Sequence, residues 1–206
     1  MKKTFFFLIF IFCLNTFGQK NNVFDSLSIE LKKIKSNCKI KSNNKRALNL
    51  LDNLYNETMQ SNISYLSEKT TSELKEFQNN RDIPNWHIFY LFNIYQNHIA
   101  ESQNSNTQTN ANFQIASMKL LSGELLETYK TIPPIILIYM GEALLSGNKI
   151  DAARNHFKMS FEFFPKSIPL KVYCYLLSND IKEKEKLFNE LKTENSNHWM
   201  VIEKLN

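Results

Sequence analysis

The segment IPPIILIYMGEALLSGNKIDAARNHFKMSFEFFP, residues 132–165, decides the fold, because it carries the signals for two helices joined by a tight turn. A proline pair at 133–134 opens the first helix, where backbone amides have no partner in any case, and Thr131 is available as its N-cap. The dipeptide Gly147-Asn148 interrupts the helical pattern, and Pro165 ends the second helix. The segment therefore predicts helix, turn, helix.

Small residues occur in this segment where the two helices are expected to cross. Gly141 and Ala153 would allow the two backbones to approach closely, and Phe157 would fill the gap between the layers. We therefore expect a larger side chain at either small position to force the helices apart.

The same residues resemble the tetratricopeptide repeat (TPR), a helix-turn-helix unit of about 34 residues. With Pro165 as the closing proline, Gly141, Ala153 and Phe157 also match favoured residues of that family. The remaining signature positions keep an apolar or small character and are Leu137, Met140, Leu144 and Ser160. The resemblance covers about residues 134–167, with degenerate neighbours, and implies an all-α fold in which antiparallel hairpins stack as a short right-handed solenoid. A generic hairpin in an unrelated all-α domain is the alternative.

Helical spacing of apolar residues continues through the rest of the chain. It predicts helices near 22–36, 45–60, 64–79, 84–101, 111–130, 168–178, 180–192 and 199–205. A polar stretch near 102–112 is expected to be a loop. The chain has only four glycines, which argues against a β-rich fold with many tight turns. Residues 19–206 are thus expected to form one α-helical domain.

The N-terminal sequence MKKTFFFLIFIFCLNTFGQK has two lysines followed by a short apolar run. The run is too short for a stable membrane span, so residues 1–18 are interpreted as a cleaved secretory signal. We expect an exported bacterial protein, periplasmic or secreted, with no stable membrane span after cleavage. Lipid attachment at Cys13 is disfavoured because Phe12 is not small, and a retained N-terminal anchor is a further alternative.

The charge of the chain limits the classes of partner that are expected, and its cysteines allow one disulfide. The formal charge of +5 falls when the two signal lysines are removed, and the remaining charges are mixed along helices, so no nucleic-acid partner is expected. A basic concentration at 32–46 either contacts an anionic surface or is simply exposed to solvent. Cys38 and Cys174 either form one disulfide or remain two buried thiols.

No motif for catalysis or cofactor binding is present. The chain lacks a GxSxG elbow, an HExxH pair, a Walker loop and a dinucleotide glycine fingerprint. His87 and His98 would be separated by roughly 16 Å along one helix, too far to share a metal. We therefore expect no enzyme activity, no cofactor and no metal.

Glu142 is exceptional because it is a carboxylate in an otherwise apolar segment. The TPR resemblance implies that one face of the first helix and of its counterpart in the next unit is concave and offered to a peptide or protein partner. The residues on this face are Ile135, Ile138, Glu142, Leu145, Val172 and Leu176. The alternative is that a neighbouring helix covers these side chains.

Two functional hypotheses follow. The first is a non-catalytic helical-repeat scaffold in the bacterial cell envelope that binds an unknown protein or peptide through an apolar groove. The second is a closed helical domain that holds a small apolar ligand or an unrecognised active site, with Glu142, His87 or His98 among its polar groups. An exposed apolar stripe would favour the first, and an enclosed pocket the second.

Overall fold

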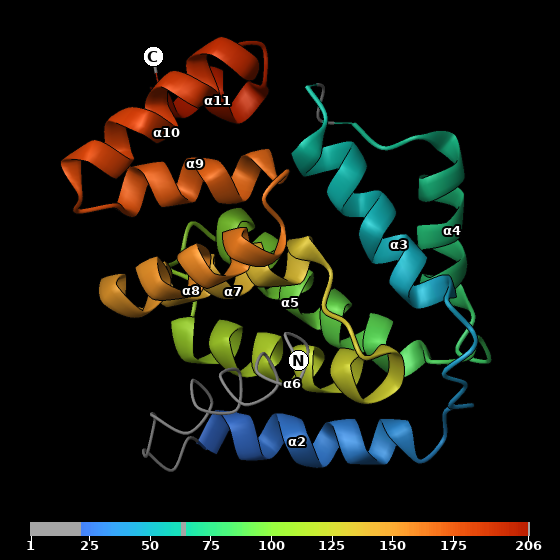
Figure 1. Ribbon diagram of the computed structural model, residues 1–206. Helices are drawn as coiled ribbons and strands as arrows, with labels where there is room; N and C mark the ends of the chain where they lie inside the picture. Colours follow the sequence, from blue (N-terminus) through green and yellow to red (C-terminus); the bar gives the residue numbers. More distant parts are fainter. Residues whose placement is uncertain (1–21, 63–64, 206) are drawn as a thin grey trace.

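The computed structural model describes residues 22–62 and 65–205, and this part of the chain forms an all-α fold with no strand (Figure 1). The expected signal peptide, residues 1–18, lies outside the described residues. The helices are α2 (Asn22–Lys35), α3 (Arg46–Tyr55), α4 (Glu68–Asn79), α5 (Trp86–Asn104), α6 (Ala111–Tyr129), α7 (Pro134–Ser146), α8 (Ile150–Phe163), α9 (Ile168–Leu177), α10 (Ile181–Glu194) and α11 (Trp199–Leu205). A π-helical turn, η1 (Asn56–Gln60), extends α3. None of these helices combines the length and the apolar character needed to cross a bilayer.

The central hairpin is α7 and α8, as the sequence predicts, but its caps differ in detail. Pro133 occupies the N-cap position of α7 with no side-chain cap bond, so Thr131 does not cap the helix. In the turn, Gly147 has a negative φ, and Asn148 adopts the left-handed conformation at φ 54°. Asparagine tolerates this region better than most residues do, which explains the dipeptide.

The polar loop between α5 and α6 is shorter than expected. Helix α5 continues to Asn104, Ser102 is buried, and the side chain of Asn110 caps α6 by accepting from two backbone amides. His98 accepts a further bond from the Asn110 amide at 2.9 Å. Polar residues in a last helical turn have the composition of a loop, so composition alone extended the predicted loop into both helices.

Helices α5 to α10 form a run in which each helix packs against the next. Figure 1 shows α2 at one end of this run, against α5 and α6, and α10 with α11 at the other end. The α3–α4 hairpin lies alongside, with α3 packed against α7 and α5. The first helix of the central hairpin is therefore covered by α3 as well as by α6 and α8.

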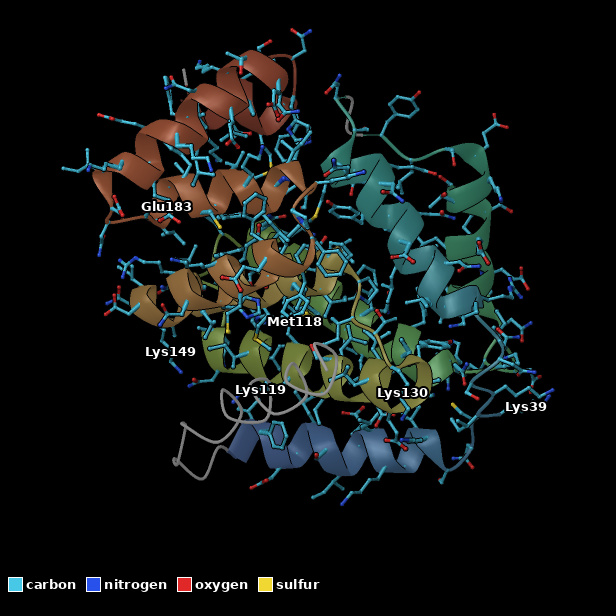
Figure 2. The ribbon with its side chains drawn as sticks, in the orientation of Figure 1. Lys39, Met118, Lys119, Lys130, Lys149 and Glu183 are labelled. Atoms are coloured by element: carbon cyan, nitrogen blue, oxygen red, sulfur yellow. The ribbon has the colours of Figure 1, made fainter. Side chains whose placement is uncertain are left out.

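Two apolar clusters hold the helices together. The large one runs from α2 to the start of α9, and Met118, which Figure 2 shows among the helices of the stack, is fully buried in it. The small one joins α9, α10 and α11 through Val172, Leu191, Met200 and Val201. The C-terminal helices thus have an apolar cluster of their own.

Within the central hairpin, the ring of Phe157 packs against the backbone of Gly141. A Cβ at position 141 would lie well inside van der Waals distance of three atoms of that ring. Both Phe157 and Ala153 are 0% exposed. The small residue at 141 is therefore required by an aromatic side chain of α8.

The π-helical turn η1 connects segments that are distant in sequence. Glu57 accepts bonds from the hydroxyls of Ser67 and Thr70 at the start of α4. Gln60 donates to the carbonyl of Lys166 at 3.0 Å and accepts from the amide of Ile168 at 3.0 Å, at the start of α9. One short turn thereby fixes the beginnings of two helices.

The same turn also holds the C-terminal helix. His198, which is fully buried, donates from Nε2 to the carbonyl of Met59 at 2.8 Å, and its Nδ1 accepts from the amide of Met200 at 3.3 Å. Both bonds require a neutral ring, and burial lowers the pKa of His198 despite the Met59 carbonyl. Protonation of Nδ1 would remove the acceptor for Met200.

We predict that Gly141→Ala destabilises the protein by about 1–3 kcal/mol, because the added methyl group overlaps the Phe157 ring. The matched control is Gly123→Ala in α6, where nothing lies within 4 Å of the new Cβ. This control should stabilise by roughly 0.5–1 kcal/mol, because it removes a glycine from a helix interior. Urea unfolding measures both, and equal effects of the two substitutions would contradict the packing described.

Acidification should release α11. The folded-state pKa of His198 lies below its usual value of about 6.5. As the pH falls below about 6.5, the unfolded state therefore binds more protons than the folded state does. The free energy of unfolding decreases until the pH reaches the folded-state pKa. His156, whose pKa burial also lowers, adds to the global decrease. Hydrogen-exchange protection of α11 should therefore fall between about pH 6.5 and 5 in the wild type and stay level in His198→Gln. His156→Gln should retain the response of α11, and its loss there would contradict the assignment to His198.

Candidate functional site

Glu142 lies at the centre of a group of tyrosines that come from three helices. Tyr139 is one turn earlier on α7, Tyr95 comes from α5, and Tyr173 comes from α9. The Tyr173 hydroxyl donates to Glu142 Oε1 at 2.5 Å. Glu142 is half-buried, so its carboxylate is shielded from most of the solvent while part of the side chain stays accessible.

The rings of this group pack against one another. The centroids of Tyr95 and Tyr139 are 5.2 Å apart, and those of Tyr139 and Phe92 are 6.3 Å apart. Tyr95 is fully buried, whereas Tyr139 and Tyr173 are only partly so. The group therefore runs from the core at Tyr95 toward the surface at Glu142 and Tyr173.

The position of Tyr173 depends on the glycine in the neighbouring helix. Phe157 sits against the backbone of Gly141, and the Tyr173 ring stacks on Phe157 with centroids 4.2 Å apart and planes 9° apart. This stacking fixes the plane of the tyrosine and directs its hydroxyl to Glu142. The residue next to Glu142 in the sequence thus controls the hydrogen bond that Glu142 accepts.

The environment favours the neutral form of each group at this site. Burial raises the pKa of Glu142, and the hydrogen bond from Tyr173 and the positive charge of Lys204 only partly oppose it. Burial, together with the charge of Glu142, also raises the pKa of Tyr95 and of Tyr173, and it raises the pKa of Tyr139 to about 12. A carboxylate with a raised pKa among hydroxyl groups is typical of functional sites.

The six residues predicted to form a partner-binding face differ in their exposure to solvent. Ile135 and Ile138 are 1% exposed and Val172 is 0% exposed. Glu142 and Leu145 are half-buried, and Leu176 is 38% exposed. The accessible part of the predicted face therefore consists of Glu142, Leu145 and Leu176.

His87 and His98, the histidines named for a possible active site, have described contacts with residues other than Glu142. His98 contacts the Asn110 amide and the ring of Phe113, with centroids 4.6 Å apart, and so holds the α5–α6 loop. His87 is 0% exposed, and its Nε2 lies 3.1 Å from Glu124 Oε2. No set of three or more His, Cys, Asp or Glu side chains in the described ranges is arranged to hold a metal ion.

Glu124 is the second buried carboxylate of interest. Its Oε2 is 2.7 Å from Nζ of Lys35 on α2, in addition to its contact with His87 on α5. Burial acts to raise the pKa of Glu124, but His87 and Lys35 outweigh it and lower the pKa. This cluster ties α2 to the helix stack and has its charges matched, unlike Glu142.

Cys38 and Cys174, the cysteines among the described residues, are free thiols in the structure. Burial raises the pKa of Cys38, and it raises the pKa of Cys174 to about 12. Neither thiol is therefore activated as a nucleophile, because only the thiolate attacks.

Sequence reasoning singled out Glu142 but missed the tyrosines around it. A signal was present, since Tyr139 and Tyr173 are 34 residues apart, the length of the repeat that the central hairpin resembles. Tyr95 has no such signal, because the long α5–α6 pair breaks the spacing.

Comparisons with protein-family models, with curated proteins and with solved structures find no match to this chain.

Removal of the Tyr173 hydroxyl should destabilise the fold and raise the pKa of Glu142 further. We predict a loss of about 1–3 kcal/mol at pH 7 for Tyr173→Phe, because a half-buried carboxylate loses its donor. Unfolding measurements give the stability, and carboxyl ¹³C NMR titration gives the pKa.

Glu142→Gln is the complementary change. The folded-state pKa of Glu142 is above its usual 4.5, so the stability that its protonated form provides is present below that pH and is lost as the pH rises through the folded-state value. The amide keeps an acceptor for Tyr173 and cannot ionise. We expect no loss of stability at pH 7, and a marked loss would show that the ionised carboxylate is needed for folding.

Proposed function

We propose that the protein is an exported, TPR-like helical-repeat scaffold that binds a protein or peptide in the bacterial cell envelope without catalysis. The exported location rests on the N-terminal sequence. The repeat assignment is supported by the run of helices in which each packs on the next, and by the spacing of Tyr139 and Tyr173.

One observation carries the binding proposal. Glu142 is a half-buried carboxylate with a raised pKa, and no Lys, Arg or His among the described residues forms an ion pair with it. Taking a carboxylate out of water without a cation costs free energy, and such sites persist where binding or chemistry requires them. Leu145, one turn later on α7, is half-buried, and Leu176, 34 residues after Glu142, is 38% exposed, so both offer apolar surface to a partner.

A closed helical domain is the second candidate, and a contact between α11 and η1 favours it. His198 of α11 contacts Met59 of η1, so the C-terminal helix is joined to the turn that extends α3. Ile135, Ile138 and Val172 are buried as such a domain requires. However, the depression of about 420 Å³ beside η1, lined in part by Tyr55 and Phe163, is open to solvent.

A capture experiment tests the scaffold. Wild-type protein and the double variant Glu142→Gln/Leu176→Ser would serve as baits for native envelope extract, with bound proteins quantified by mass spectrometry. We predict that recovery of specific partners falls by about tenfold or more in the double variant, because two of the three accessible residues of the predicted face are changed.

The matched control is Ile29→Ser, which alters an apolar side chain that is 69% exposed on α2 at the other end of the molecule. This variant should recover partners as the wild type does. Equal recovery by all three baits would remove Glu142 and Leu176 from the binding surface.

A further inference from the structure

We propose that Glu142, Tyr139 and Tyr173 form a binding site for a cationic side chain, the ammonium group of a lysine or the guanidinium group of an arginine on the partner protein. This inference rests on the proposed scaffold function and names the chemistry of the group that is recognised.

The first argument is the unmatched charge at Glu142. Only one of its carboxylate oxygens, Oε1, has a hydrogen bond that the structure describes, and the donor is the neutral hydroxyl of Tyr173. Lys204 is the basic residue whose charge acts on Glu142, but its Nζ lies 2.6 Å from Glu203 Oε1. A cation from outside would therefore supply the counter-charge that the described residues do not provide.

Glu124 shows how the same fold treats a carboxylate that has a structural role. That side chain is contacted by both Lys35 and His87. Its pKa is lowered, whereas that of Glu142 is raised. Glu124, which joins α2 and α5 to α6, thus has a described ion pair with Lys35, whereas Glu142 has no described ion pair.

The second argument comes from the aromatic rings. A cation placed over an aromatic face is attracted by the ring quadrupole, and the protein uses this contact repeatedly. Its own Lys or Arg side chains lie 5.3–5.8 Å from the ring centroids of Tyr129, Phe77, Trp86, Tyr175 and Phe188. Tyr139 and Tyr173 are partly accessible, so their rings are available for the same kind of contact with a cation of the partner.

The two arguments select the same ligand. A carboxylate attracts cations and repels anions, and the Tyr173 hydroxyl already donates its proton to Glu142, so its oxygen is free to accept. The aliphatic stem of a lysine or arginine would pack on the tyrosine rings while its charged end reaches the carboxylate. Neutral and acidic side chains meet only part of this chemistry.

The test is an NMR titration of the purified protein, ¹³C-labelled at glutamate carboxyl groups and tyrosine rings. The probes are N-acetyl-lysine N-methylamide, N-acetyl-arginine N-methylamide and the uncharged isostere N-acetyl-norleucine N-methylamide. We expect saturable shifts at Glu142, Tyr139 and Tyr173 with the two cationic probes and none with the norleucine probe. Equal shifts with all three probes would overturn the proposal.

Two variants separate a specific site from general attraction to negative charge. Glu142→Gln keeps an acceptor for Tyr173 and should weaken lysine binding by about tenfold or more, the scale expected for loss of a charged hydrogen-bond partner. Glu162→Gln removes an exposed carboxylate of α8 and should leave binding within about twofold. An equal loss in both variants would overturn the proposal.

Two further measurements complete the test. Titration with spermidine identifies the source of the cation, and comparison with the capture experiment separates this inference from the scaffold function. Binding of spermidine more than about tenfold tighter than the lysine probe would assign the site to free polyamines and overturn the partner assignment. Partner capture that depends on Glu142 without any binding of the cationic probes would overturn the cation site but leave the scaffold intact. Probe binding at Glu142 without any captured partner would support the cation site and remove the scaffold function.

Discussion

The contact between the Phe157 ring and the bare backbone of Gly141 is the constraint on which the rest of the structure depends. It sets how closely α7 and α8 approach, because any side chain at 141 would occupy the space of the ring. It also provides the surface on which Tyr173 stacks, and Tyr173 in turn binds Glu142. Helix packing and the candidate site are therefore consequences of one aromatic contact.

A second constraint is the set of contacts made by η1. The turn η1 binds the starts of α4 and α9 through Glu57 and Gln60, and it accepts His198 of α11 at the carbonyl of Met59. An open repeat array would leave the first helices of its hairpins exposed. In this protein, α3 packs against α7, and α10 with α11 covers Val172, so only Glu142, Leu145 and Leu176 of the predicted face remain accessible.

A small accessible face favours recognition by a few specific groups over recognition by area. In the cation site that we propose, one carboxylate and two tyrosine rings discriminate a cationic side chain from a neutral one, while Ile135 and Ile138 are buried in the core. The structural carboxylate Glu124, whose charge is matched by Lys35, differs from Glu142 in this respect. The distinction between the two lies in their partners, which are distant in sequence.

The sequence by itself determined the elements and their order. Periodic apolar residues, the proline pair, the Gly147-Asn148 turn and the small residue at 141 all act locally, so they specify helices and the central hairpin without knowledge of the rest of the chain. It also marked Glu142, because a charge in an apolar helix is visible in one segment.

Only the tertiary structure decided what surrounds these elements. The placement of α3 over α7, the contact of His198 with Met59 across 139 positions, and the convergence of Tyr95 and Tyr173 on Glu142 all join residues from separate helices. Such contacts depend on how whole helices pack, and that packing is the sum of many side-chain contacts that no local pattern records. The predicted concave face is for the same reason largely buried, since the helices that cover it are far from it in the sequence.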